Sequence, residues 1–317
     1  MIKLSFSTLM RIATLISVSA LAGCGGGAST VNPLSPSRVI AIGDAYNAVD
    51  ATGSGTFTVR NGATDNTVAG RIAAKYGITL NGATGAPLAS TGGFSYASGT
   101  NGKAVDVQNQ VGLFLADVSN SVGPKDLIII SVGSQDIVAQ APTNNTAALA
   151  AAANTVKNAV QSLTNAGAKY VLIVLPINMA RTPWGLGGAG GLVTTDSIRA
   201  LSYDTGTQCL SFSCQLATKL NAAYPATTNH QPILLADLMS YANLFTGTTP
   251  DTYLTYGVTN PNTAACNAGG TSGCATNVVN ANYATYIFAD TLNLTPFGNA
   301  LLADQIYNVN FYRAAWR

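Results

Sequence analysis

The sequence contains no glutamate, a single histidine and few charged residues of either sign. All 13 acidic residues are aspartates, charged residues make up 9% of the 317, and the formal net charge is +2. Such a small and scattered charge argues against a nucleic-acid partner, which needs a concentrated basic surface. Hydrophobic residues reach 47% and recur in short runs, which argues against disorder and is enough for a sizeable core.

The single histidine limits the catalytic machinery that the chain can carry. His230 stands just before the apolar run Pro232 to Leu238, at the N-terminal end of a predicted strand. Ligand sites of parallel α/β sheets lie beyond the carboxyl ends of the strands, roughly 20 Å from that position. We therefore interpret His230 as a loop or surface residue.

Residues 1–23 are predicted to be an export signal and not part of the fold. A basic start precedes a short apolar segment, Ile12 to Ala22, that is too short to span a bilayer. The segment ends in Leu-Ala-Gly-Cys24, which resembles the bacterial lipobox. That resemblance implies cleavage before Cys24 and acylation of Cys24, and Gly25 at the next position implies anchoring in the outer membrane. A plain secretory signal with a chance cysteine is the alternative.

The chain after the signal divides into a tether and one folded domain. Residues 24–37 are rich in Gly, Ser and Pro and are predicted to be flexible. Residues 38–317 contain no internal repeat, and we expect them to form a single domain.

Four cysteines remain after Cys24, an even number that is typical of disulfides in an exported chain. Proximity in sequence favours Cys209 with Cys214 and Cys266 with Cys274, although three pairings are possible. No histidine or acidic residue stands close to them, so no metal site is expected. The glycine-rich stretch 183–191 lacks the Lys-Ser/Thr of a phosphate-binding loop, and we expect no cofactor.

Short apolar runs alternate with helical patterns along the domain. Strands are predicted at Val39–Ile42, Asp126–Val132, Lys169–Leu175 and Pro232–Leu238, with a short extended run at Tyr286–Asp290. Helices are predicted at Thr67–Tyr76, Asp106–Ser119, Thr146–Ala166 and, with an interruption, Thr195–Tyr224; another begins at Thr295-Pro296. Gly92 to Gly102 is expected to be a loop. This alternation predicts a doubly wound, mostly parallel α/β domain.

Four short blocks, met in order along the domain, resemble the GDSL (SGNH) family of esterases and lipases. They are GDA at 43–45, YASGTN at 96–101, VGSQDI at 132–137 and ADTLNLTPFGNALLA at 289–303. The resemblance spans nearly the whole mature chain. It implies a three-layer α/β/α, flavodoxin-like fold with a mostly parallel, five-stranded sheet.

The resemblance also assigns positions to the family's catalytic residues. Ala45 stands where the family has its nucleophilic serine, Asn293 where it has the catalytic histidine, and Asp290 is retained. The oxyanion-hole positions correspond to Ala45, Gly99 and Gln135, the last of which is Asn in the family.

These replacements remove the parts that ester hydrolysis needs. Ala45 offers a methyl group in place of a hydroxyl, and the amide of Asn293 cannot take up a proton near neutral pH. Gln135 is one methylene longer than asparagine, which displaces an oxyanion donor by roughly 1.5 Å. Tyr46 has the nearest hydroxyl but no base beside it.

Two hypotheses follow, and a third class is kept beside them. The first is a catalytically inactive SGNH-like lipoprotein that binds an acyl, glycan or protein ligand at a site lined by Asp44, Tyr46 and Asp136. The alternative is an active GDSL-type esterase or lipase with a non-standard site. A purely structural envelope lipoprotein is the third. Asp44 and Asp136 are expected to orient backbone N–H groups rather than to catalyse.

Overall fold

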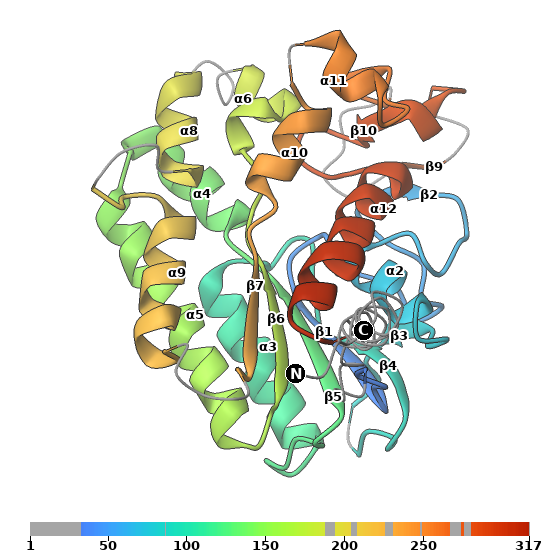
Figure 1. The fold of residues 1–317 in the computed structure, drawn as a ribbon, viewed down its shortest axis with the longest axis vertical. Helices are drawn as coiled ribbons and strands as arrows, with labels where there is room; N and C mark the ends of the chain where they lie inside the picture. The colour runs from blue at the N-terminus through green and yellow to red at the C-terminus, as the bar shows by residue number, and fades with distance from the viewer. Residues whose placement is uncertain are drawn as a thin grey trace, which may run out of the picture. The chain divides into compact units, whose positions relative to one another are not determined.

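A parallel sheet of six strands runs through the unit Leu34–Arg317 of the computed structural model (Figure 1). The structure describes residues 33–85, 87–187, 194–203, 208–225, 231–247, 249–266, 274–275 and 280–316. The strand order is β3–β4–β1–β5–β6–β7, and each neighbouring pair is parallel. The strands are β1 (Arg38–Gly43), β3 (Leu80–Gly82), β4 (Gly92–Ser95), β5 (Asp126–Ser131), β6 (Tyr170–Val174) and β7 (Ile233–Ala236).

The central sheet has six strands, not the expected five. Two of them, the short strands β3 and β4 on one side of β1, were not predicted, whereas the predicted run at Tyr286–Asp290 lies in a separate small sheet. The stretch Gly92–Ser95, which we expected to be a loop, is β4 and pairs directly with β1. A Cβ on Gly93 would lie 2.5 Å from the carbonyl oxygen of Thr79, so glycine lets the neighbouring chain approach closely.

Two small sheets lie outside the central one. The extended run at Tyr286–Phe288 is β10 and pairs with β8 (Asn260–Ala264). A second pair joins β2 (Val59–Arg60) to β9 (Cys274–Ala275).

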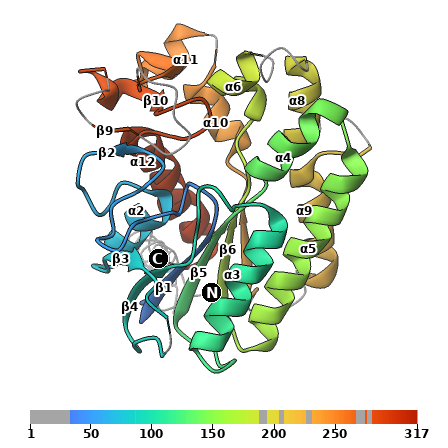
Figure 2. The same cartoon turned by 180° about the vertical axis from the view of Figure 1, so that it is seen from behind.

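Helices cover both faces of the central sheet, as the two views show (Figures 1 and 2). One face carries α3 (Ala104–Asp117), α4 (Ser134–Gln140), α5 (Thr146–Asn165), α8 (Thr195–Ser202) and α9 (Phe212–Ala223). The other carries α2 (Val68–Ala74), α10 (Met239–Phe245) and α12 (Pro296–Gln305). The described residues also form the short α-helices α6 (Pro183–Leu186) and α11 (Pro250–Leu254), three 3-10 helices, η1 (Ala141–Thr143), η2 (Met179–Arg181) and η4 (Tyr283–Thr285), and the π-helix η5 (Ile306–Phe311).

The strands alternate their side chains between two separate hydrophobic clusters. In β1, Ile40 and Ile42 pack with α3 and α5, whereas Val39 and Ala41 pack with α2 and α12. Residues on both faces of β1 are fully buried, as expected for a parallel sheet between two helical layers. The predicted three-layer α/β/α architecture is confirmed.

Helix ends follow the capping signals in the sequence. The Asn145 side chain accepts a hydrogen bond from Ala148 N at the start of α5, and Gly167, with φ of +104°, follows its end. Thr295 accepts from Gly298 N at 3.0 Å and so caps α12, as predicted. The short helices α10 and α11, which end at Phe245 and Leu254, were not predicted from the sequence.

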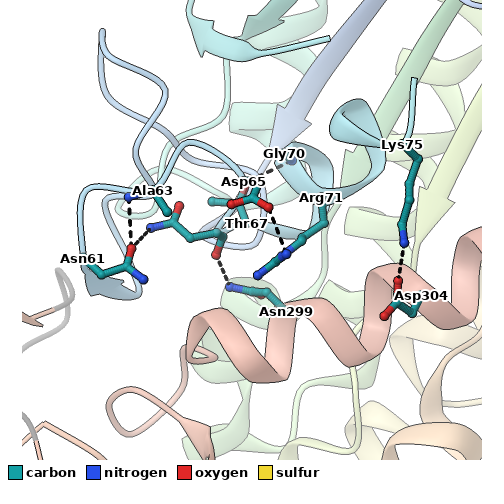
Figure 3. Close-up of polar contacts among 10 residues, drawn as sticks. Asn61, Ala63, Asp65, Thr67, Gly70, Arg71, Lys75, Asn299 and Asp304 are labelled. Carbon is teal, nitrogen blue, oxygen red and sulfur yellow. Dashed lines mark hydrogen bonds and ion pairs between the residues drawn. The ribbon is translucent and has the colours of Figure 1, made fainter. Parts of the chain in front are cut away.

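Helix α12 is joined to α2 and the loop before it by polar contacts (Figure 3). Lys75 Nζ lies 2.8 Å from Asp304 Oδ1, and Asn299 Nδ2 donates to the carbonyl oxygen of Asn66 at 2.9 Å. The Asn299 contact is buried, so it fixes the C-terminal helix against the segment that follows β1. The last sequence block is thus held close to the first.

The structure confirms both predicted disulfides, Cys209–Cys214 and Cys266–Cys274. The second lies where β9 meets β2, so it holds the small sheet to the loop after β8. No helix within the described residues is long and apolar enough to cross a membrane.

The packed unit begins at Leu34, slightly before the boundary expected at residue 38. Leu34 is buried in the core, and Ser37 N donates to the carbonyl oxygen of Lys125 at 3.1 Å. Next to it, Arg38 and Asp126 form a buried ion pair in which Nε donates to Oδ1 at 2.9 Å. The pair joins the first residues of β1 and β5 and so helps to set their register.

We predict that Arg38→Met destabilises the protein by about 3–5 kcal/mol, because it leaves the buried Asp126 carboxylate without its cation. Urea unfolding of the oxidised protein measures this loss. Arg199→Met is the matched control: its partner Asp196 is exposed, so we expect a loss below about 1 kcal/mol. Equal losses in the two variants would contradict the assignment.

Candidate functional site at the ends of β1 and β5

The carboxyl end of β1 is fixed by a glycine and a buried glutamine. Gly43 has φ of +117°, and a Cβ there would lie 1.8 Å from the carbonyl oxygen of Ser131, so only glycine fits. Gln110 of α3 accepts from Gly43 N at 2.6 Å and donates to Gly43 O at 3.2 Å. The strand ends here because a helix side chain takes up both backbone groups.

The loop that follows is anchored by a second buried amide. Asn47 Nδ2 donates to the carbonyl oxygens of Ile42 and Ile129, at 2.9 and 3.2 Å. Ser95 Oγ donates to the Asn47 carbonyl oxygen at 2.9 Å. Three neighbouring strands, β1, β5 and β4, therefore hold one four-residue turn in place.

The strand order changes direction between β1 and β5. From β1 the chain builds β3 and β4 on one side, and it then crosses to β5 on the other. Connections that leave two adjacent strands in opposite directions leave room for ligands at their carboxyl ends. Asp44 N donates to Ser131 O at 3.0 Å and holds the two ends together.

Four buried side-chain oxygens gather at these ends without a hydrogen-bond partner of standard geometry. They are Asp44 Oδ2, Tyr46 OH, Ser131 Oγ and Ser134 Oγ. The Asp44, Tyr46 and Ser131 side chains are almost completely buried, with exposures of 2%, 4% and 1%. The hydroxyls of Ser131 and Ser134 nevertheless interact with the Asp44 carboxyl, and that of Ser134 with Tyr46, so these oxygens have partners among themselves. We call these four residues the oxygen cluster.

The members of the oxygen cluster influence one another electrostatically. Burial raises the pKa of the Asp44 carboxyl, while hydrogen bonds from the hydroxyls of Ser131 and Ser134 act in the opposite direction. Burial, together with the charges of Asp44 and Asp290, raises the pKa of Tyr46. Tyr46 is therefore a neutral phenol near pH 7, and its hydroxyl lies among both carboxyls and the Ser134 hydroxyl.

Asp136 adds a third buried carboxyl, from the first turn of α4. It accepts hydrogen bonds from Ala104 N, at 3.0 Å to Oδ2, and so holds the start of α3. Burial, with a smaller contribution from the charge of Asp44, raises the pKa of Asp136 to about 6. Asp44 likewise accepts from Tyr46 N at 3.2 Å, so both aspartates orient backbone N–H groups, as expected.

Asp290 and Asn293 form a closed pair in the last block. Asp290 Oδ1 accepts from Leu292 N at 2.8 Å and from Asn293 N at 2.7 Å, and Oδ2 accepts from Asn293 Nδ2 at 2.8 Å. Both residues are buried, with exposures of 3% and 6%. Burial raises the pKa of Asp290, and the Asn293 and Leu292 hydrogen bonds oppose that rise.

Three hydrogen bonds hold the loop of residues 290–294 and the turn after β1 against their neighbours. Thr58 Oγ1 donates to the Leu294 carbonyl oxygen at 2.8 Å, and Trp184 N donates to that of Thr291 at 2.9 Å. Val68 N donates to the Tyr46 carbonyl oxygen at 2.9 Å. The pKa of Tyr46 responds to Asp44, Ser134 and Asp290, so residues of the first, third and last sequence blocks lie around Tyr46.

The structure gives less support for the three predicted oxyanion-hole residues than for the aspartates. Ala45 is buried, with an exposure of 6%, and contributes only a methyl group. Gly99 is buried against the ring of Phe57, where a Cβ would overlap the ring at 2.1 Å. Gln135 is half-buried beside Ser134. No hydrogen bond among the described residues joins these three to one another, so their shared role stays a prediction. Cys24 and His230 lie outside the described residues.

Sequence reasoning did not single out Ser131, the last residue of β5, or Ser134, the first residue of α4. A signal was present for Ser134, because it directly follows Gly133 just as Asp44 directly follows Gly43. Gly133, like Gly43, has a positive φ (+111°). Gln110 and Asn47 were missed for a different reason: the sequence around a polar residue of a helix or loop does not indicate that the residue is buried.

No family model matches the chain, and no curated protein matches it in sequence. Within the part of the chain that the structure describes, no group of three or more His, Cys, Asp or Glu side chains has an arrangement that holds a metal ion. The site is therefore characterised by its own geometry, namely three buried carboxyls, three buried hydroxyls and the Asn293 amide.

We predict that Asp136→Asn stabilises the protein at pH 8 by up to about 3 kcal/mol, since a pKa raised from 3.8 to about 6 means that burial disfavours the ionised carboxyl. The native state binds the proton more tightly than the unfolded state, so wild-type stability falls as pH rises from 4 through 6. The gain of the variant should disappear below about pH 4. Urea unfolding from pH 3.5 to 8 measures it.

The exposed Asp251→Asn is the control, and we expect no pH-dependent gain from it. A gain in Asp136→Asn that does not change with pH would contradict the prediction.

Proposed function

We propose that the chain is an exported lipoprotein whose GDSL (SGNH)-like domain binds a ligand at the ends of β1 and β5 and does not cleave esters through the family's triad. The Asp290–Asn293 pair is the observation that carries this proposal. The Asp290 carboxyl accepts three N–H groups, one of them from the amide of Asn293. That amide can be oriented by a carboxylate as an imidazole would be, but it cannot accept a proton at neutral pH.

The expected loss of reaction rate is too large for even slow ester hydrolysis by the family's triad. Loss of a complete triad costs about 10⁶ in rate, equivalent to roughly 8 kcal/mol of barrier. Here the nucleophile and the base are both replaced, at Ala45 and Asn293, and the donor at Gln135 differs as well. What supports binding is the retained position of the site, which lies where the strand order changes direction.

An active esterase with a non-standard site is the second candidate, and one observation favours it. The Ser134 hydroxyl lies close enough to the Asp44 carboxyl to affect its pKa, which is the pairing of a hydroxyl with a possible proton acceptor. Against it, Ser134 Oγ is fully buried, so an ester cannot reach it without movement of the surrounding residues.

The ligand class follows from the resemblance: an acyl chain, a glycan or a protein. Membrane attachment through acylated Cys24, in the outer membrane, is part of the same proposal. The two disulfides agree with export into an oxidising compartment.

We predict that the purified protein hydrolyses short-chain p-nitrophenyl esters no faster than an Ala45→Gly variant, and that a fluorophosphonate probe labels no residue. Mass spectrometry of the labelled protein identifies any modified side chain. Labelling of Ser134, abolished by Ser134→Ala and accompanied by ester turnover, would contradict the proposal and support the second candidate.

The positive control restores the missing parts. Ala45→Ser with Asn293→His places a hydroxyl and an imidazole next to the retained Asp290, and activity should rise about tenfold or more above the wild-type background. Adding Gln135→Asn should raise it further, and adding Asp290→Asn should remove most of the gain. An inactive but folded triple variant would mean that the blocks are wrongly aligned with the family.

Membrane attachment is tested separately. We predict that the chain expressed in a bacterial host incorporates radiolabelled palmitate and sediments with the outer membrane, because a thioether-linked diacylglycerol and an amide-linked acyl chain anchor firmly. Cys24→Ser should abolish both. Secretion of an unlabelled wild-type protein would instead support the plain secretory signal.

A further inference from the structure

The end of the domain at which the strands of the central sheet begin carries exposed basic residues. Lys125 and Lys169 stand directly before the neighbouring strands β5 and β6, and both are exposed. The last described residues of the chain lie beside them, because the ring centroid of Trp316 is 5.3 Å from that of Tyr170, the first residue of β6. Four exposed residues form what we call the amino-end face: Lys125, Lys169, Tyr312 and Arg313.

The aspartates at this end of the domain do not cancel that positive charge. Each one that the structure describes here already has a partner, and the pairs are Asp117–Tyr96, Asp126–Arg38 and Asp304–Lys75. No ion pair formed by the described residues includes Lys125 or Arg313. The buried Asp44, Asp136 and Asp290 lie at the opposite end, where the strands finish. The domain is therefore more positive at its amino end than at the end that carries the candidate site.

The net charge of the chain does not explain this asymmetry. Once Lys3 and Arg11 are removed with the predicted signal, the chain has equal numbers of basic and acidic side chains. An anionic surface would thus be attracted to the amino-end face and not to the domain as a whole. Tyr312, which is 67% exposed, adds an aromatic ring of the kind that is enriched at bilayer surfaces.

The packed unit also begins at the amino-end face. Leu34 is its first residue, and Ser37 N donates to the Lys125 carbonyl oxygen at 3.1 Å. Cys24 precedes Leu34 by ten residues, a length of chain that spans at most about 36 Å. A lipid on Cys24 would keep this face close to the bilayer, at an effective concentration that makes a weak contact sufficient.

We propose that the amino-end face lies against the headgroups of an anionic phospholipid bilayer, with the carboxyl ends of β1 and β5 directed away from it. Lys and Arg side chains close to an anionic bilayer contribute a favourable energy that salt weakens. This inference goes beyond the proposed ligand binding, and of the proposed function it rests only on anchoring through Cys24.

The two tryptophans of the chain lie at opposite ends of the domain and can report its orientation. Trp316 lies at the amino end, whereas Trp184 N donates to the Thr291 carbonyl oxygen in the last block. The acylated protein is placed in vesicles that contain a headgroup-spin-labelled lipid, and tryptophan fluorescence is measured in Trp184→Phe and Trp316→Phe. In phosphatidylglycerol vesicles we expect the spin label to quench Trp316 at least about twofold more than Trp184. In phosphatidylcholine vesicles, or in 1 M salt, we expect this difference to disappear, because the Debye length is then only about 3 Å.

Charge variants in the Trp184→Phe background identify the face. Lys125→Gln and Arg313→Gln should each lower the ratio of bilayer-facing to detached domains about fivefold. Arg60→Gln is the matched control: Arg60 is an exposed cation of β2, away from the amino-end face, and its loss should leave the ratio unchanged. Circular dichroism melting shows whether each variant is folded, and if one of the two face variants does not fold, the other decides.

The same domain is also anchored independently of Cys24, by a His tag placed before residue 25 that binds a nickel-chelating lipid. Selective quenching of Trp316 on these vesicles, with no palmitate on the wild-type chain, would reject the lipid anchor and support the assignment of the face. Equal quenching of the two tryptophans, quenching that is the same in both lipids, or no effect of Lys125→Gln and Arg313→Gln would overturn the inference and leave the lipid anchor standing.

Discussion

The register between β1 and β5 is the constraint on which the site depends. Gly43 stands opposite Ser131, and Asp44 N donates to Ser131 O immediately beyond that pair. Side chains alternate along a strand, so a slip of one residue would send Ser131 to the opposite face of the sheet and separate it from Asp44. Two features at the ends of the strands fix the register: the Arg38–Asp126 ion pair at the start and the close approach of Gly43 to Ser131 at the finish.

The same constraint places the buried polar groups of the site beside one another. The backbone at the strand ends is satisfied by Gln110 and Asn47, whose amides bond to main-chain groups of β1 and β5. The hydroxyls of Ser131 and Ser134 are therefore left to hydrogen-bond with the Asp44 side chain, which follows the end of β1.

The three layers of the fold could be predicted from the sequence, but the short strands at one edge of the central sheet could not. Long apolar runs such as that of β5 and the amphipathic stripe of α5 are strong signals because burial on two faces or one face dictates their composition. The strands β3 and β4 are three and four residues long and contain glycine, so their pairing is decided by β1 and not by local propensity. The capping Thr295 and both disulfides could be predicted because their signals are local.

Residues of the site could be predicted from the sequence only where a polar residue directly follows the end of a predicted strand or lies in one of the four blocks. Asp44 was found in the first way, because it directly follows Gly43 after an apolar run, whereas Asp136 was found through the VGSQDI block. Ser131 escaped because it is the last residue of β5 itself, where a serine reads as part of the strand. Whether a polar side chain is partnered is a property of the packed structure, and the sequence alone does not contain it.

Two groups of buried polar side chains lie on different sides of Tyr46. On one side, the Asp290–Asn293 pair is internally satisfied, so it has no remaining need for a ligand to stabilise it. On the other side, the hydroxyls of Ser131 and Ser134 hydrogen-bond with the buried Asp44 carboxyl, and that of Ser134 with Tyr46. Both sets of contacts are internal to the protein, so the polar groups around Tyr46 stabilise one another and hold the loop of residues 290–294 and the turn after β1 in place.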